Sequence, residues 1–264
     1  MFTLAIVGCG YLAEIITNGV INNLLPDYHL TAVMSRSEKN ANRIADKINR
    51  SSLGYSCKPY TDIDELLELK PDFIVETASP SAFKSFAVKA LKNGSSIVTL
   101  SIGAFADNDF YDEVATAATE NRSRVYIASG AIGGFDVLRT ATLMGNASVT
   151  FSTEKNPGPL RHTSLYVEDL QHKKQEVFKG NATQAIAVLP TQVNVSVAAS
   201  IASVGPENVD VSITSIPGFV GDRHKIRIKN QQVDALIDVY SSTPEIAAWS
   251  VIETLQNIVS PIVF

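Results

Sequence analysis

The residues best suited to chemistry lie near the start of the chain, in the run Gly8-Cys9-Gly10-Tyr11-Leu12-Ala13 after the apolar segment Leu4–Val7. In this Gly-x-Gly-x-x-Ala pattern the first glycine permits a tight turn, and the second lets the backbone approach a pyrophosphate. The following helix offers N–H groups and a partial positive charge to phosphates. The pattern predicts a dinucleotide site contacted by Gly8, Gly10, Tyr11 and Leu12. An ordinary strand–helix turn is the alternative.

The adenosine end of such a site is set by the residues after the second strand, here Met34-Ser35-Arg36-Ser37. Folds that prefer NAD carry an acidic side chain at this point, which binds the ribose hydroxyls. This chain has no carboxylate before Glu38, whereas Ser35 and Arg36 suit a 2′-phosphate because a guanidinium pairs with it bidentately. The sequence therefore favours NADP, with NAD as the other option. A solvated surface arginine is the alternative interpretation of Arg36.

Three further segments carry small and polar residues where parallel strands are expected to end. Glu76-Thr77-Ala78-Ser79-Pro80 and Ser101–Ala104 each follow a buried apolar run, at the sheet edge where such folds bind ligands. We expect Ala78 and Ser79 to contact the cofactor. The stretch Ala128–Gly134 contains three glycines, which allow the backbone to approach a flat ligand or to cross between domains.

The chain has four histidines, and one of them is a candidate for proton transfer. His224 begins a predicted strand after the loop Pro217–Asp222, and an imidazole titrates near neutral pH. His162 and His172 lie among polar residues and are expected at the surface. His29 precedes a strand and is expected to be structural or solvated.

The elements that must position these residues change in character near residue 130. Before it, short apolar runs alternate with helical patterns, which predicts a doubly wound parallel α/β sheet of the Rossmann type. The expected strands are Thr3–Val7, Leu30–Met34, Phe73–Glu76, Ile97–Leu100 and Val125–Ile127, and the expected helices Leu12–Asn23, Glu38–Asn49, Asp62–Leu69, Pro80–Asn93 and Asp109–Asn121.

After Gly130 the pattern predicts a smaller α+β domain with an antiparallel sheet. Its expected strands are Val149–Thr153, Ser164–Val167, Val209–Ile216, Lys225–Lys229 and Ala235–Tyr240, with helices at Ala182–Leu189 and Val195–Val204. A last helix over Glu245–Ile258, with Ile246, Trp249, Ile252 and Leu255 as a core stripe, is expected to dock on the first domain. We thus expect a dinucleotide-binding domain at 1–130 plus 244–264 and a catalytic and dimerisation domain at 131–243.

Composition narrows the class of protein. The 264 residues carry a net charge of −5, which argues against a nucleic-acid partner. No window holds the roughly 18 uninterrupted apolar residues of a membrane span, and no signal peptide is evident. Cys9 and Cys57 show no metal-ligand or redox spacing, so a reduced, cytoplasmic protein without a structural metal is expected.

In combination, these motifs resemble the L-aspartate dehydrogenase family over essentially the whole chain. The resemblance rests on Gly8–Gly10, Glu76–Pro80, Ser101–Asp107, Ser129–Asp136, Pro190–Val195 and His224–Ile226, of which Ser129–Gly134 is the most specific. It implies a usually dimeric, nicotinamide-dependent enzyme that oxidises L-aspartate or reduces its imine. It also implies cofactor contacts from Ala131 and Asn194, and catalysis by His224.

The expected chemistry is hydride transfer from the amino-acid Cα, followed by hydrolysis of the imine with His224 as the proton shuttle. Arg223 or Lys225 could bind a substrate carboxylate, although alternation along a strand places them opposite His224. Gly221-Asp222, Thr243–Ala247 and Gln192 depart from the family pattern around the substrate, which leaves another amino or imino acid open. Two alternatives are a sugar or hydroxy-acid oxidoreductase of the same plan, and a non-catalytic dinucleotide sensor.

Overall fold

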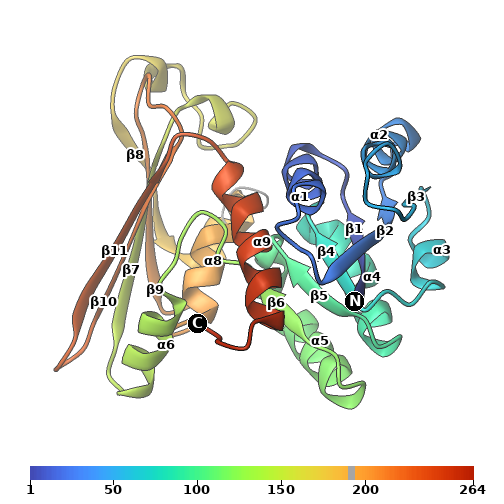
Figure 1. Ribbon diagram of the computed structural model, residues 1–264. Helices are drawn as coiled ribbons and strands as arrows, with labels where there is room; N and C mark the ends of the chain where they lie inside the picture. Colours follow the sequence, from blue (N-terminus) through green and yellow to red (C-terminus); the bar gives the residue numbers. More distant parts are fainter. Residues whose placement is uncertain (190–193) are drawn as a thin grey trace. The chain divides into compact units, whose positions relative to one another are not determined.

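The computed structural model describes residues 1–189 and 194–264, which divide into two compact units (Figure 1). The first unit contains residues 1–128 and 247–264, and the second contains residues 129–246. None of the helices in the described ranges has the length and apolar character that crossing a bilayer requires.

The first unit is built on a six-stranded parallel sheet in the order β3-β2-β1-β4-β5-β6. Its strands are β1 (Phe2–Val7), β2 (Tyr28–Met34), β3 (Lys58–Tyr60), β4 (Phe73–Glu76), β5 (Ser96–Thr99) and β6 (Val125–Ile127). This is the strand order of the Rossmann fold, which confirms the predicted architecture. The order reverses between β1 and β4, and the crevice outside the carboxyl ends of the strands at that point is where such sheets bind ligands.

Helices cover this sheet. They are α1 (Tyr11–Ile21), α2 (Glu38–Asn49), α3 (Ile63–Leu67), α4 (Pro80–Lys92), η1 (Ile102–Ala106) and α5 (Asn108–Glu120). The α-helices follow the predicted bounds to within about two residues, whereas the 3₁₀ helix η1 and strand β3 were not predicted. Helices α2 and α4 begin at serine caps, because the Ser37 and Ser79 hydroxyls accept hydrogen bonds from backbone N–H groups three residues on. Ser79 therefore starts α4 at the end of the loop that follows β4.

The last helix, α9 (Glu245–Val259), adds its buried face to the core of the first unit from Ala247 onward. The Tyr28 hydroxyl donates to the Leu255 carbonyl over 2.8 Å. The predicted stripe was wrong at Trp249, which is 49% exposed, and at Ile246, which is half-buried and belongs to the second unit; the buried apolar positions are Ala248, Val251, Ile252 and Leu255. The true stripe advances by three or four residues, as a helical period requires.

The second unit is built on a five-stranded sheet in the order β11-β10-β7-β9-β8, which is mixed rather than purely antiparallel because β7 pairs parallel with β9. Its strands are β7 (Ser148–Lys155), β8 (Gln175–Asn181), β9 (Val209–Ser215), β10 (Asp222–Lys229) and β11 (Asp234–Ser241). Its helices are α6 (Phe135–Leu143), α7 (Ala182–Val188) and α8 (Asn194–Ile201), with short 3₁₀ turns η2 (Gly158–Leu160) and η3 (Glu168–Gln171).

Two further features of this unit differ from the prediction. The predicted strand at Ser164–Val167 is a turn leading into η3, and the strand lies instead at β8. Helix α6 was not predicted, because three nearby glycines mask its start and its N-cap, Gly134, adopts a left-handed φ of 74°. At Gly134 a Cβ would also lie 2.5 Å from the Ile237 side chain.

Candidate functional site

The glycine turn after β1 is held against the loop that follows β4. Gly8 has a φ of 101°, and a Cβ placed there would lie only 2.7 Å from the backbone nitrogen of Ala78. The Thr77 hydroxyl donates to the Gly8 carbonyl over 2.8 Å, and the Thr77 N–H donates to the Val7 carbonyl over 2.9 Å. Gly8 is therefore required both by its backbone conformation and by the close approach of this loop.

The loop is in turn fixed by Glu76, a fully buried carboxylate at the end of β4. One oxygen accepts from the N–H groups of Ala78 (2.7 Å) and Ser79 (3.1 Å) and from the Ser101 hydroxyl (2.9 Å). The other oxygen accepts from the Thr99 hydroxyl (2.7 Å) and the Ser101 N–H (3.1 Å). Burial raises the pKa of Glu76, and these hydrogen bonds oppose that effect. Five hydrogen-bond donors surround the Glu76 side chain, which acts only as an acceptor when it is ionised.

A cavity of about 440 Å³ opens beside the glycine turn. Six of the predicted cofactor-contacting residues line it: Gly8, Gly10, Ser35, Arg36, Ala78 and Ser79. A Cβ on Gly10 would meet nothing within 4 Å, and Gly10 caps α1 without any side chain of its own. The start of an eleven-residue helix thus adjoins an open space, as a bound pyrophosphate requires. These residues fit a nicotinamide dinucleotide.

The charge of the cavity lining bears on the choice of cofactor. The described residues that line it include the cation Arg36 and no carboxylate. The Ser35 hydroxyl accepts from the Ser37 N–H over 3.3 Å, so it is tied into the turn before α2. Tyr11 and Leu12, also predicted to contact the cofactor, begin α1 and do not line the cavity; Tyr11 is 56% exposed.

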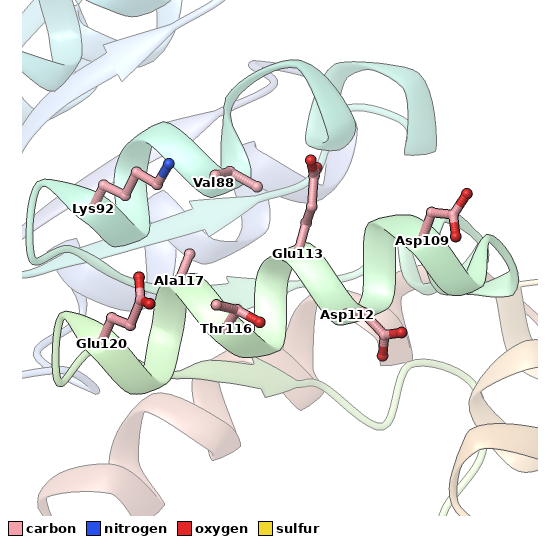
Figure 2. Close-up of a pocket in the computed structure, with 8 residues that line it drawn as sticks. All are labelled: Val88, Lys92, Asp109, Asp112, Glu113, Thr116, Ala117 and Glu120. Atoms are coloured by element: carbon pink, nitrogen blue, oxygen red, sulfur yellow. The ribbon is translucent and has the colours of Figure 1, made fainter.

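A second hollow, of about 390 Å³, lies between α4 and α5 and is lined by Asp109, Asp112, Glu113 and Glu120 with Lys92 (Figure 2). In the close-up, the Glu113 and Asp112 side chains point in opposite directions from α5. Within residues 1–189 and 194–264, no three acidic, histidine or cysteine side chains form a possible metal site. We assign no function to this hollow.

The inward face of the second sheet is apolar along most of its length and polar at one end. Strand pairing sets its side chains in four rows across β9, β7, β10 and β11. Two rows are apolar: Val209, Val149, Ile228 and Ala235, then Val211, Phe151, Ile226 and Ile237. The next row contains Ile213, Thr153, His224 and Val239, and the last, which we call the polar row, contains Ser215, Lys155, Asp222 and Ser241.

His224 lies where this face changes from apolar to polar. It is 5% exposed, and its ring stacks on Phe151 with centroids 5.8 Å apart. Burial lowers the pKa of His224 to about 4; Lys155 acts in the same direction and Asp222 in the opposite one. The imidazole is therefore neutral near pH 7 and can accept a proton.

Buried polar atoms without hydrogen-bond partners gather at the same place. Within the described residues there are five such side-chain atoms, and four of them belong to Thr153, Ser215, Ser241 and His224 (its Nδ1). Such atoms are rare in folded proteins and call for an explanation, which either a bound ligand or buried water would provide. The end of this sheet thus has the chemistry of a substrate site.

The remaining residues predicted for the site lie as follows. Ala131, half-buried, is in a turn before α6, and Asn194 is the first residue of α8. Gln192 and most of the Pro190–Val195 motif lie outside the described residues.

The four histidines differ sharply in their surroundings. His162 and His172 are exposed, and His29 stacks on Tyr55 at 4.2 Å. Of the four, only His224 is buried.

Arg223 and Lys225 occupy the other face of the sheet from His224. Arg223 donates two hydrogen bonds to Asp238, at 2.8 and 2.7 Å, and Lys225 lies 3.8 Å from the same carboxylate. Their suggested role in binding a substrate carboxylate is therefore wrong, for the reason that strand alternation gives.

Sequence reasoning missed Lys155 altogether, and it flagged Glu76 only as part of a motif. The signal for Lys155 was the alternation Val149, Phe151, Thr153, Lys155, which continues the inward face of β7 into a charged residue. The predicted strand ended at Thr153, two residues too early to include it.

Comparison with known proteins agrees with both units. Residues 8–128 match the family model of the homoserine dehydrogenase NAD-binding domain, and residues 136–258 match that of the aspartate dehydrogenase C-terminal domain. The L-aspartate dehydrogenase of Methanosarcina mazei is 31% identical over 99% of this chain and 98% of its own.

Solved structures share the fold. The aspartate dehydrogenase of Thermotoga maritima matches with a TM-score of 0.76 and 24% identity, over 100% of this chain and 99% of its own. A hyperthermophilic archaeal homoserine dehydrogenase in complex with NADPH matches with a TM-score of 0.61 and 14% identity, over 96% and 95%. With these relatives, the chain belongs to the L-aspartate dehydrogenase family and is an NAD(P)-dependent amino-acid oxidoreductase.

Proposed function

We propose that this enzyme interconverts L-aspartate and its keto acid plus ammonia, with His224 as the catalytic residue. The observation that carries the proposal is a buried, neutral imidazole at the polar end of an apolar sheet face, with an Nδ1 that has no hydrogen-bond partner among the described residues. The names of the relatives supply aspartate as the first substrate to test.

When bound, the cofactor would accept a hydride from the substrate Cα in the oxidative direction and donate one in the reductive direction. Gly8, Gly10, Ser35, Arg36, Ala78 and Ser79 would hold it in the first unit, with Tyr11 and Leu12 at the start of α1. Ala131 and Asn194 are the further cofactor contacts that the family resemblance implies. In the oxidative direction the substrate loses a hydride from Cα and a proton from nitrogen, which leaves an imine. His224 takes a proton from water as the oxygen bonds to the imine carbon. It returns that proton to the nitrogen and then takes the hydroxyl proton as the carbinolamine collapses, so that ammonia leaves and the keto acid remains.

The test is turnover, followed by absorbance of the reduced cofactor. Aspartate, glutamate, alanine and malate are compared, as are oxaloacetate and pyruvate with ammonium. We expect aspartate and oxaloacetate to be the best substrates of their sets. A preference for malate would favour the hydroxy-acid alternative, and tight cofactor binding without any turnover would favour the sensor.

A variant of His224 tests its role. His224→Ala is expected to lower kcat by about 10²–10⁴-fold, the usual contribution of a general acid–base, and to leave cofactor affinity nearly unchanged. His162→Ala, at an exposed histidine of the same unit, is the matched control. Turnover by His224→Ala equal to that of the control would exclude the assignment.

We further propose that NADP is the preferred cofactor, because the described lining of the cavity offers Arg36 and no carboxylate to the ribose. Arg36→Ala is expected to raise the KM for NADPH by about 10–100-fold, as loss of a charge-assisted pair predicts, with little change for NADH. Lys39→Ala, at an exposed position of α2, is the control. Equal losses for both cofactors would contradict a 2′-phosphate contact.

We further propose that the enzyme is a homodimer in the cytoplasm. Both cysteines are buried and free, which suits a reducing compartment. Light scattering in solution tests the oligomeric state, and a monomeric mass at micromolar concentration would contradict the dimer.

A further inference from the structure

Lys155 is a buried cation on the inward face of the second sheet. It is the last residue of β7, only 5% of it is exposed, and no described carboxylate lies within ion-pair distance of its ammonium. A buried charge without a partner is costly, so proteins seldom keep one that serves no purpose. Burial lowers the pKa of Lys155, and Asp222, directly opposite on β10, raises it again.

The neighbours of Lys155 are polar atoms that also lack partners. Ser215 is directly opposite on β9, and Thr153 is two residues earlier on the same face. The hydroxyls of both are buried without a hydrogen bond among the described residues. One ammonium and two hydroxyls form a set of donors that fits a carboxylate.

His224 is diagonal to Lys155 across the β7–β10 pair, because His224 pairs with Thr153 and Asp222 pairs with Lys155. Diagonal neighbours in antiparallel strands are about 7–8 Å apart at Cα, close enough for long side chains to reach the same small molecule. A small molecule held at the ammonium of Lys155 therefore lies within reach of His224.

Other cations of the sheet cannot take this role. Arg223 and Arg227 pair with Asp238 and Asp234 on the other face, at 2.7 and 2.6 Å. Among the four inward rows, Lys155 is the one cation.

We propose that Lys155 binds a carboxylate of the substrate, assisted by the hydroxyls of Ser215 and Thr153, and so makes the enzyme select amino acids by their acid group. This deepens the proposed function and rests on it for the identity of the substrate. Asp222, opposite Lys155, opposes the effect of burial by raising the pKa of the lysine.

The test removes the positive charge of Lys155 in one variant and keeps a cation there in another. Lys155→Met removes the ammonium, Lys155→Arg keeps a cation, and Lys229→Met removes an exposed cation from β10 as the matched control. Removal of an unpaired buried charge leaves folding intact, so Lys155→Met should unfold at or above the wild-type temperature. The first readout is calorimetric titration of succinate, an unreactive dicarboxylate, into each protein saturated with reduced cofactor.

We expect Lys155→Met to bind succinate at least about 30-fold more weakly than wild type, and its KM for aspartate to rise by a similar factor. The KM for the cofactor should stay unchanged, as should the pH profile of kcat, and Lys155→Arg should recover part of the affinity. Succinate affinity in Lys155→Met equal to that in Lys229→Met would overturn the proposal. A loss confined to kcat, with a shifted pH profile and no recovery by arginine, would also overturn it and indicate proton transfer instead.

The outcomes separate this proposal from the one it rests on. If wild type binds succinate through Lys155 but turns over neither aspartate nor any other amino acid tested, the proposed reaction fails and the carboxylate site stands. If wild type does not bind succinate at all, the carboxylate site fails, whatever substrate is turned over.

Discussion

The buried carboxylate of Glu76 offers a sharp test of how the strand ends build the cofactor site. Replacing it with alanine removes the acceptor for five donors, but these donors are not equal. The Ser101 N–H also reaches the Thr99 hydroxyl oxygen at 3.0 Å, so it keeps an acceptor, and both hydroxyls can rotate. The N–H groups of Ala78 and Ser79 contact no other described acceptor and would be left unsatisfied.

The expected loss of stability in Glu76→Ala follows from these two N–H groups. Ala78 is exposed and Ser79 half-buried, so water can reach both groups and each lost hydrogen bond costs about 1 kcal/mol; Glu76→Ala should therefore lower the free energy of unfolding by about 2 kcal/mol. Glu76→Gln can keep its amide oxygen toward Ala78 and Ser79 and turn its NH₂ group toward Thr99. It should therefore lose only about 1 kcal/mol.

The consequence for function is that Ala78 and Ser79 line the cofactor cavity. We expect Glu76→Ala to weaken cofactor binding at least about tenfold, and Glu76→Gln to weaken it less than about threefold. Denaturant unfolding and fluorescence titration of the reduced cofactor measure the two quantities. Val114→Ala, at a buried position on α5 outside the cavity lining, controls for loss of stability alone.

Two results would refute this reasoning. If glutamine destabilises as much as alanine, the charge of Glu76 matters rather than its acceptor geometry. If Glu76→Ala and Val114→Ala bind the cofactor equally well, the carboxylate does not position the loop.

Two further predictions concern the glycine turn and the histidine. Gly8→Ala should cost about 3 kcal/mol or more and abolish cofactor binding, since its Cβ meets backbone; Gly54→Ala, also at positive φ but in open space, should cost only about 1. Equal losses would exclude the clash. Between pH 6.5 and 4 the unfolded chain protonates His224 while the folded one does not, so wild-type stability should fall by about 2–3 kcal/mol more than that of His224→Gln from pH 7 to 4.5. Parallel pH profiles in denaturant unfolding would contradict the lowered pKa.

The first unit was predictable because its signals are local. Period-two and period-3.6 patterns, a glycine fingerprint and serine caps each act within a few residues, so α2, β4 and β6 begin and end as expected. The second unit depends on pairing between distant strands. Its parallel β7–β9 pair leaves no mark in either strand alone, and the polar stretch of β8 (Gln175–Asn181) lacks the apolar alternation on which strand prediction rests.

The same contrast explains which site residues the sequence revealed. His224 stands out in the sequence because histidine is rare in this chain. Lysine is common, and the proposed role of Lys155 is evident only from its burial and its strand register. Gly221 shows how the register is set: its φ is 74°, and a Cβ there would lie only 1.8 Å from the Ser241 carbonyl oxygen. Only glycine lets β10 begin so close to the end of β11, and that start places Asp222 beside Lys155. Gly221 and Asp222 therefore help to set the register of the polar row, so under the proposed function substrate choice depends on sheet register as much as on side-chain identity.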